Sequence, residues 1–562
     1  MSLGFKCPTC GSYNFTMRID VDSDAMKEEL CAEYDPVSCG EVEEMLSLID
    51  KDYQRCAYEI SRLQLQVEAL SSRQRQLKAY ESKLRYLVAP IRKLPSEILI
   101  LIFNHVSQHN YFREYPSLKS YLWRDGEDGL NAMPALVLSS VCSGWRRLAL
   151  SYSTIWSRIS LILDLKVSDH ESNTERLGFF TTVQRYIDRS GTSLLWLRID
   201  TRGDSIVSRP HPTLSLLGKQ THRWQHLTFY GNNYISREIF SIPKNVIDFP
   251  MLEDIEYDTV GRRSLEIFGQ VPKVKTLKLE TYIGHVAAAN FPWRQLTSLD
   301  VAIRGRVSEV ADLCPNVTKL RFQTFIVKRH SEADTPSPRA FRLLQSLSLV
   351  ITNPLGETTW LDVILASSIC PSLTSLTVER HILEDNLTPK VAWPLRTLET
   401  FLTLSSCALT SLSIQGLQLP DNDLIDIFKR LPSVATLTIQ DPYLDLDFSN
   451  TITPTLIQSL HSTRHPSSNS PLLPKLRYLT LSYAGKVFDD AGFVDMIESR
   501  CLSNADALSI GIDPLRSLVL RSLHRTPTSL GEVAKNYEPL RLLDKQNGFR
   551  LIIKGVPPTA AM

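Results

Sequence analysis

The sequence predicts an α+β protein of several domains, in which a long N-terminal helix and a short helical domain precede an irregular α/β solenoid. Three observations lead to this prediction. A six-residue apolar pattern recurs twelve times between Leu194 and Leu520. A heptad pattern runs through residues 42–88, and a dense apolar helix is expected within residues 91–106. The length of 562 residues agrees with these observations, because it is enough for more than one cooperative unit.

The recurring pattern, here called the ladder, has the form Φ-x-x-Φ-x-Φ, in which Φ is apolar, as in LTSLDV at 296–301. Every ladder position is apolar, although only 43% of the residues in the chain are hydrophobic. The copies begin at Leu194, Trp224, Leu252, Val274, Leu296, Val317, Leu344, Leu373, Leu409, Val434, Leu476 and Leu515.

Proline lies two residues before the first ladder position in six copies, at Pro250, Pro272, Pro315, Pro371, Pro432 and Pro474. Because proline cannot continue a helix and favours extended backbone before it, a helix should end and a strand begin at these points. Copies start 21–42 residues apart, a spacing typical of strand–turn–helix units that must stack on their neighbours. The pattern resembles the leucine-rich repeat in an irregular form, with loops inserted at 328–339 and 461–471. A β-rich domain with many similar strands is the alternative.

The resemblance implies that the strands line a concave face, and that the residue between the last two ladder positions points out of it. These row residues are Arg198, Thr228, Glu256, Lys278, Asp300, Arg321, Ser348, Thr377, Ser413, Thr438, Thr480 and Val519. The first half of the row is charged with mixed signs, and the second half is mostly Ser and Thr. We expect the row to bind a target protein around Glu256, Lys278, Asp300 and Arg321. Taken singly, each could instead be a solvated strand residue.

Composition excludes several classes of protein. The net charge of +1 gives no basic field for nucleic acid or membranes. The apolar run from Ile98 to Phe103 is far too short to span a bilayer, and the first residues do not look like a signal peptide. Ten cysteines are too few for a disulfide scaffold of this length, so we expect a cytoplasmic or nuclear protein.

Residues 1–41 form a leader with one candidate metal motif. Cys7 and Cys10 stand two residues apart in CPTC, as in half of a zinc site. A closed site needs four ligands, and Cys31 and Cys39 have a different spacing, so no firm metal site or cofactor is predicted. A disordered leader is the alternative.

Residues 42–90 are predicted to form one long coiled-coil-like helix. Its seam positions alternate in spacing between four and three residues, which is a heptad pattern, and Gln74 and Glu81 interrupt the seam with polar side chains. The seam consists of Val42, Leu46, Ile49, Tyr53, Cys56, Ile60, Leu63, Val67, Leu70, Gln74, Leu77, Glu81, Leu84 and Val88. The pattern leaves open whether the helix associates with a second copy or folds onto the following domain.

Residues 91–162 carry a second family resemblance. The segment IRKLPSEILILIF begins a helix at a proline with Glu97 in its first turn, and VCSGWRRLA (141–149) and Trp156 follow. This order resembles the F-box. The leader, the coiled coil and APIRKLPSE (89–97) resemble a fungal, basidiomycete-type group of F-box proteins. An insert at 107–134 is a departure from the compact F-box, which has only a short connection between its first and second helices.

The F-box resemblance implies binding to the Skp-family adaptor of a cullin–RING ubiquitin ligase. The residues implied in this contact are Leu94, Pro95, Ile98, Ile102, Val141, Cys142 and Trp145. The alternative is a plain three-helix bundle in which these residues are ordinary core.

The expected function is a substrate-recognition adaptor without catalysis, because we find no GxSxG, HExxH, P-loop or GxGxxG motif. The repeats, at 163–525, would hold a target protein, and 526–562 would form a cap and tail. A protein-interaction scaffold outside any ligase is the main alternative. An extracellular repeat receptor is disfavoured.

Overall fold

A computed structural model of the chain shows an α+β protein with one long helix and one large parallel sheet. It describes residues 4–6, 13–16, 18–19, 39–114, 133–164, 173–202, 211–231, 240–242, 249–258, 265–282, 290–302, 307–324, 338–351, 357–380, 393–417, 419–441, 452–463, 471–483, 488–522, 537–546 and 549–555. The chain divides into two compact units, Met1–Leu99 and Ile100–Met562.

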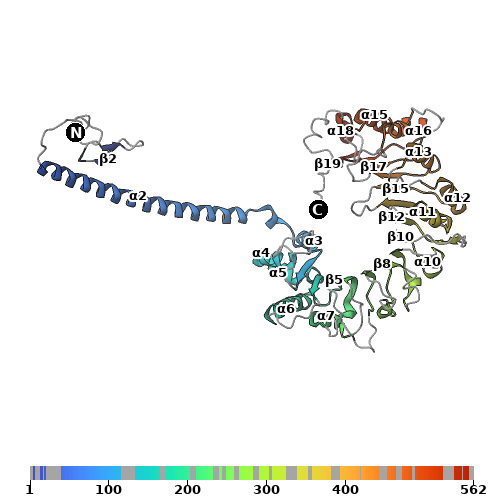
Figure 1. Cartoon of the computed structure of the whole chain (residues 1–562), viewed down its shortest axis with the longest axis horizontal. Helices are drawn as coiled ribbons and strands as arrows, with labels where there is room; N and C mark the ends of the chain where they lie inside the picture. Colours follow the sequence, from blue (N-terminus) through green and yellow to red (C-terminus); the bar gives the residue numbers. More distant parts are fainter. Residues whose placement is uncertain are drawn as a thin grey trace. The chain divides into compact units, whose positions relative to one another are not determined.

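The first unit is dominated by α2 (Cys39–Leu87), a single helix of 49 residues that confirms the predicted long helix (Figure 1). In the leader, β1 (Gly4–Lys6) and β2 (Tyr13–Thr16) pair antiparallel. The Asp52 carboxylate accepts hydrogen bonds from the backbone N–H groups of Arg18 and Ile19, so part of the leader is fastened to α2. The turn η1 (Pro90–Lys93) follows, and α3 (Ser96–Val106) runs across the division between the units.

The second unit contains a sheet of fifteen parallel strands whose spatial order follows the chain order. Figure 1 shows the strands on the inner side of an arc and the helices on its outer side. The strands are β3 (Asn110–Arg113), β4 (Arg158–Asp164), β5 (Leu195–Arg202), β6 (Trp224–Gly231), β7 (Asp254–Asp258), β8 (Thr276–Tyr282), β9 (Ser298–Ala302), β10 (Lys319–Thr324), β12 (Ser346–Ile351), β14 (Ser375–Arg380), β15 (Ser411–Gln415), β16 (Thr436–Gln440), β17 (Tyr478–Tyr483), β18 (Ser517–Ser522) and β19 (Arg550–Gly555). A separate pair joins β11 (Arg339–Ala340) to β13 (Ser368–Ile369).

Helices and 3-10 turns connect the strands. The helices are α4 (Pro134–Val141), α5 (Ser143–Ser151), α6 (Asn173–Ser190), α7 (Pro212–Gly218), α10 (Val307–Leu313), α11 (Glu357–Ala366), α12 (Leu395–Ser405), α13 (Asp421–Lys429), α14 (Pro454–Ser459), α15 (Asp490–Arg500), α16 (Asn504–Ile510) and α18 (Glu538–Gln546). The 3-10 turns are η3 (Ser153–Trp156), η4 (Thr221–Arg223), η5 (Glu266–Phe268) and η6 (Trp293–Gln295).

The ladder residues form the core of the sheet's outer layer. Every one of them except Leu194, which is half-buried, is buried. All six prolines that precede a ladder copy stand in a turn directly before the strand. The backbone carbonyl directly before a strand commonly accepts two N–H groups from the residues at the start of the neighbouring strand. For example, Lys275 O, before β8, accepts the N–H groups of Thr297 and Ser298, at the start of β9, at 2.8 and 3.0 Å. Burial and backbone pairing therefore repeat with the pattern seen in the sequence.

The sheet extends beyond the predicted range of 163–525 at both ends. β3 lies inside the segment assigned to the insert at 107–134, β4 begins inside the F-box-like segment, and β19 lies in the predicted tail. Trp156, Ile159 and Leu161 in fact follow the ladder pattern and are buried. In β3, however, the polar residue Asn110 pairs with Ile159 at an inward position, so the apolar pattern is broken there.

Asn110 connects three elements at the first edge of the sheet. Its side chain is fully buried, and its Nδ2 donates to the carbonyls of Ile155 and Arg158, both at 2.9 Å. Its Oδ1 accepts the N–H of Ala135, in the first turn of α4, at 3.1 Å. The Arg158 guanidinium in turn donates to Asn104 O near the end of α3, at 2.9 Å. The helices and the sheet are thus joined by polar side chains that satisfy buried backbone groups.

Arg500 has the same role near the other end of the sheet. It is fully buried at the end of α15 and donates to the carbonyls of Leu460, Leu472 and Leu473, at 2.6, 2.6 and 3.2 Å. Burial lowers the pKa of its guanidinium to about 10. This value is still well above 7, so the guanidinium remains charged at neutral pH. The planar guanidinium directs separate donors at each carbonyl, which a lysine ammonium on a flexible stem cannot reproduce.

We expect Arg500→Lys to destabilise the second unit by about 2 kcal/mol, because buried carbonyls lose their donors. Urea unfolding followed by tryptophan fluorescence would measure this. Arg516→Lys, at an exposed position, is the matched control and should leave the transition unchanged. Equal stability of the two variants would contradict the role given to Arg500.

Asn110→Asp should destabilise the first edge of the sheet by about 3 kcal/mol. The substitution replaces the amide NH2 group, which donates to the carbonyls of Ile155 and Arg158, by a carboxylate oxygen that cannot donate to them. Hydrogen exchange should become faster in β3 and the start of α4. Asn316→Asp removes one exposed bond to Arg294 O, of 2.8 Å, and should have a much smaller effect. Unchanged exchange in β3 would show that Asn110 does not hold this edge.

Candidate protein-binding surfaces

The twelve row residues form one continuous line across the inner face of the sheet. Each is paired in register with the next, from Arg198 with Thr228 on β5 and β6 to Thr480 with Val519 on β17 and β18. All are half-buried, because the ladder residues on either side of them point into the opposite, buried layer. The structure therefore brings Glu256, Lys278, Asp300 and Arg321 side by side, on four successive strands.

Glu256 is the centre of the first charged cluster. Its carboxylate is ion-paired with the ammonium of Lys278 on the next strand. It also accepts the hydroxyl of Tyr230 at 2.8 Å and that of Thr228 at 3.3 Å. Burial alone would raise the pKa of Glu256, but these hydrogen bonds and the charge of Lys278 outweigh it and hold the pKa below its usual value.

Asp300 and Arg321 form the second cluster. The Asp300 carboxylate accepts the amide of Gln323 at 2.7 Å and lies 3.7 Å from Arg321 Nε. Arg321 also reaches Glu379 at 3.5 Å, across β12, where the row residue is the small Ser348. Burial raises the pKa of Asp300, and Gln323 and the nearby cations Arg321 and Lys278 offset this only in part.

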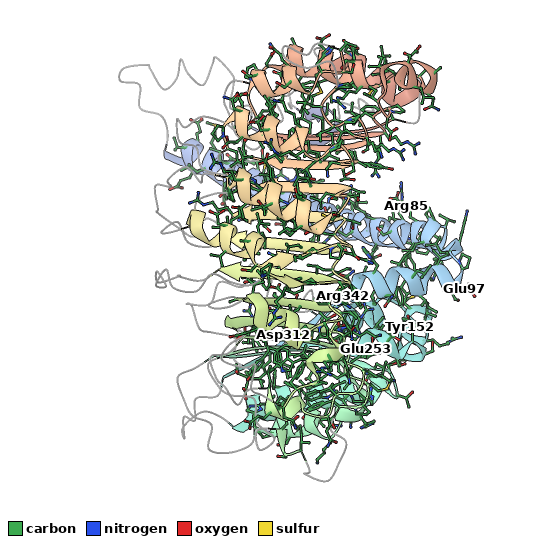
Figure 2. The ribbon with its side chains drawn as sticks, turned by 90° about the vertical axis from the view of Figure 1, so that its right-hand side faces the viewer. Arg85, Glu97, Tyr152, Glu253, Asp312 and Arg342 are labelled. Atoms are coloured by element: carbon green, nitrogen blue, oxygen red, sulfur yellow. The ribbon has the colours of Figure 1, made fainter. Side chains whose placement is uncertain are left out.

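Further pairs line the same region of the sheet. His226 Nδ1 is in hydrogen-bonding contact with the Asp254 carboxylate. Lys275 Nζ lies 2.9 Å from the carboxylate of Glu253, which is labelled in Figure 2. The signs of the four central row residues alternate from strand to strand, so this strip carries no net charge. Such a strip offers oriented hydrogen-bonding groups rather than a strong field of one sign. Beyond it the row presents hydroxyl groups from Ser348 to Thr480.

The residues implied by the F-box resemblance lie in both units. In the first, Leu94 is half-buried, and Pro95 and Ile98 are exposed. In the second, Ile102, Cys142 and Trp145 are half-buried, whereas Val141 is 48% exposed. Leu94 and Pro95 directly precede α3, and Ile98 and Ile102 lie on it. Val141 ends α4, Cys142 caps the start of α5, and Trp145 lies in the first turn of α5.

Two of these residues also have clear structural contacts. The Trp145 ring packs edge-on against the buried Phe103, with ring centroids 4.9 Å apart. The Cys142 sulfur accepts the N–H of Trp145 at 3.4 Å and caps α5. Part of what the F-box resemblance assigned to partner binding therefore also holds the helices together.

Sequence reasoning missed several residues of both surfaces. Leu101 and Leu150 are 64% and 46% exposed on α3 and α5, and the helical spacing from Ile98 could have indicated Leu101. On the sheet, Gln323 and Glu379 stand two positions after row residues, on the same face of their strands. Extending the row by that period of two could have indicated them.

The other predicted features give little. Cys7 and Cys10 lie outside the described residues, and in the described parts of the chain no group of three or more His, Cys, Asp or Glu side chains could hold a metal. No helix in the described segments is both long and apolar enough to cross a membrane.

Comparisons with known proteins identify no family for this chain. No protein-family model matches the chain, and no curated protein does. Among solved structures, the chain is similar to one in a mouse RP105/MD-1 complex, with 13% identity, a TM-score of 0.26, and coverage of 70% of this chain and 69% of that one.

We expect Glu256→Gln and Asp300→Asn to have opposite effects on stability at about pH 7. The lowered pKa of Glu256 stabilises the fold above its unfolded value of 4.5, and this is lost as the pH falls through the folded value. Glu256→Gln should therefore cost about 1 kcal/mol. The raised pKa of Asp300 has the opposite effect on stability: once the pH rises above 3.8, folding disfavours the ionised form of Asp300.

Asp300→Asn should accordingly be neutral or stabilising, by up to about 1 kcal/mol. Urea unfolding at several pH values would measure both variants. As the pH falls toward 3.8, Asp300→Asn should approach the wild type. Glu256→Gln should do so only at lower pH, once the pH falls through the lowered folded pKa of Glu256. A clear loss of stability in Asp300→Asn at neutral pH would show that the Arg321 ion pair outweighs burial.

Proposed function

We propose that this protein is a substrate-recognition adaptor of a Skp–cullin–F-box ubiquitin ligase, with its sheet built as an irregular leucine-rich-repeat solenoid. The F-box-like helices would dock the Skp-family adaptor, and through it the cullin–RING ligase. The row would hold a target protein. The setting would be cytoplasmic or nuclear, because ten cysteines are too few for a disulfide scaffold in a chain of this length.

The repeat assignment is supported by the regularity of the sheet. Strands in chain order, a buried ladder on one side and a proline turn before six of them are what stacked strand–turn–helix units require. The row residues then form the accessible side of each repeat, where a protein ligand can contact many rigid strands at once.

Exposed apolar side chains at the F-box positions carry the docking proposal. Ile98 is 42% exposed and Val141 48%, and the neighbouring Leu101 is more exposed than either. Leaving such side chains in water is unfavourable, and burying each would contribute roughly 1.5–3 kcal/mol before the cost of association. The Trp145–Phe103 contact would present the α5 surface on a rigid base.

The alternating charges favour a target with matching polar groups. Because Glu256, Lys278, Asp300 and Arg321 already neutralise one another, a strongly acidic or basic target would gain little net attraction. A target that supplies both signs in register could exchange partners with them and be distinguished from mismatched surfaces. Catalysis would then arise from proximity alone, because the adaptor would only raise the local concentration of target lysines near the ubiquitin carrier.

A scaffold outside any ligase is the second candidate. It is favoured by the exposed seam of α2, along which apolar side chains such as Leu63 and Leu70 face solvent. A scaffold needs only this helix and the repeats, and makes no use of the F-box positions.

Co-purification of the full chain with the Skp-family adaptor of the same organism tests the proposal. Leu94→Ala with Pro95→Ala should reduce binding by about tenfold or more, because central apolar anchors dominate such contacts. Leu65→Ala, at an exposed position on α2, is the matched control and should bind normally. If the wild-type chain does not bind the Skp-family adaptor, or if binding survives the double substitution, the result would favour the scaffold function.

A further inference from the structure

Helix α2 presents a long apolar seam to solvent. In the described part of the chain nothing covers the seam residues Ile60, Leu63, Val67, Leu70, Leu77 and Leu84, which are 47–70% exposed. A helix of 49 residues is about 70 Å long, and such a stripe on an isolated helix is costly in water. The seam therefore needs an occupant, and the flanking charges indicate which one.

The seam composition is that of a two-stranded coiled coil. Counting heptads, Leu63, Leu70, Leu77 and Leu84 occupy d positions, and the β-branched Ile60 and Val67 occupy a positions. Around the middle of the helix, Ile60, Leu63, Gln64 and Val67 surround a shallow hollow. These residues stand at i, i+3, i+4 and i+7, the arrangement of four that receives one side chain from a facing helix.

Charges along α2 change sign from its N-terminal half to its C-terminal half. Residues 39–62 contain six acidic and three basic side chains, and residues 63–87 contain two acidic and five basic ones. At the e positions beside the seam, Glu43 and Asp50 stand near the start, and Lys78 and Arg85 near the end. One copy of this helix is therefore complementary to a reversed second copy.

A parallel pair would oppose like charges. Glu81, at an a position, would face its own counterpart across the seam, and Arg73, at a g position, would lie beside Lys78 of the other helix. None of the e and g contacts of a parallel, in-register pair would join opposite charges.

An antiparallel pair centred on residue 65 removes these conflicts. Its central layers are apolar, since Leu63 meets Val67 and Ile60 meets Leu70 of the second copy. On the e side, Glu43 meets Arg85 and Asp50 meets Lys78. On the g side, Glu59 meets Arg73. The symmetry of the pair makes each contact twice.

We propose that α2 associates with α2 of a second copy of this chain as an antiparallel coiled coil, in the register that opposes Leu63 to Val67. The proposal goes beyond the ligase function and does not depend on it.

The surroundings of α2 are compatible with this arrangement. The leader contacts the helix through Asp52, at a g position, while the neighbouring seam residues Ile49 and Tyr53 remain 42% and 74% exposed. Glu81 is paired with Arg85 on its own helix at 2.7 Å, so its charge is balanced where it faces Ile49 of the second copy. Arg85 is labelled on α2 in Figure 2.

Antiparallel pairing has a consequence for the rest of the molecule. The C-terminal ends of the two helices lie at opposite ends of the paired segment. Each copy of the second unit therefore follows from a different end, so two sheets are presented by one assembly.

Light scattering of the full-length chain at micromolar concentration tests for the pair. A dimer is expected, and a monomer would overturn the proposal. Glu43→Lys with Asp50→Lys in one variant, and Lys78→Glu with Arg85→Glu in another, should each raise the dissociation constant about tenfold or more, because four attractive contacts become repulsive. Mixed together, the two variants should restore dimerisation as a heterodimer, which a merely misfolded variant could not do.

Disulfide trapping decides the orientation. In the proposed register Cys56 opposes Gln74 of the second copy, so oxidised Gln74→Cys should give a Cys56–residue 74 link between chains, identified by mass spectrometry after proteolysis. A parallel pair would instead link Cys56 to Cys56 in the wild type. That product, or no link between chains, would overturn the proposal. Ser72→Cys, on the face away from the seam, is the matched control and should give no link.

Discussion

Burial of two ladder side chains on each of the twelve strands that carry a ladder copy is the constraint on which the rest of the second unit depends. Side chains point alternately to the two faces along a strand. Because Leu299 and Val301 lie in the apolar layer, Asp300 must lie on the opposite face. A shift by one residue would bury the charge and expose both apolar groups. The same condition holds at each strand that carries a ladder copy, so the row follows from the core and keeps its register from β5 to β18.

That forced register explains the electrostatics of the inner face. Strands in a sheet lie about 4.8 Å apart, so charged residues in one row must interact with their neighbours. The signs alternate from Glu256 to Arg321, and each charge is compensated locally. Where a row residue is small, as at Ser348, a long side chain can reach two strands away, as Arg321 does to Glu379. The strip is thereby held in a fixed geometry before any ligand arrives.

Polar side chains solve a different problem at the ends of the sheet. There, turns and helix ends hold buried backbone groups that the strand ladder does not pair. Asn110 and Arg500 supply buried donors at these places, and Arg158 connects the end of α3 to β4. The helices that carry Val141 and Trp145 are consequently attached to the sheet by directional contacts, whereas the seam of α2 is left exposed along its length.

The sequence by itself determined the parallel sheet's core, its register and the long helix, because these depend on local periodicity that a single chain segment displays. The row from Arg198 to Val519 could be named in advance for the same reason. Only the tertiary structure decided what depends on distant partners: Asn110 at an inward position of β3, Arg500 beneath three carbonyls, and Glu379 as the second partner of Arg321. The tail strand β19 was also hidden, because Gly548 stands where the ladder would require an apolar residue. A polar residue gives no periodic pattern in the sequence, and its role is fixed only when the fold brings an unsatisfied group within hydrogen-bonding distance.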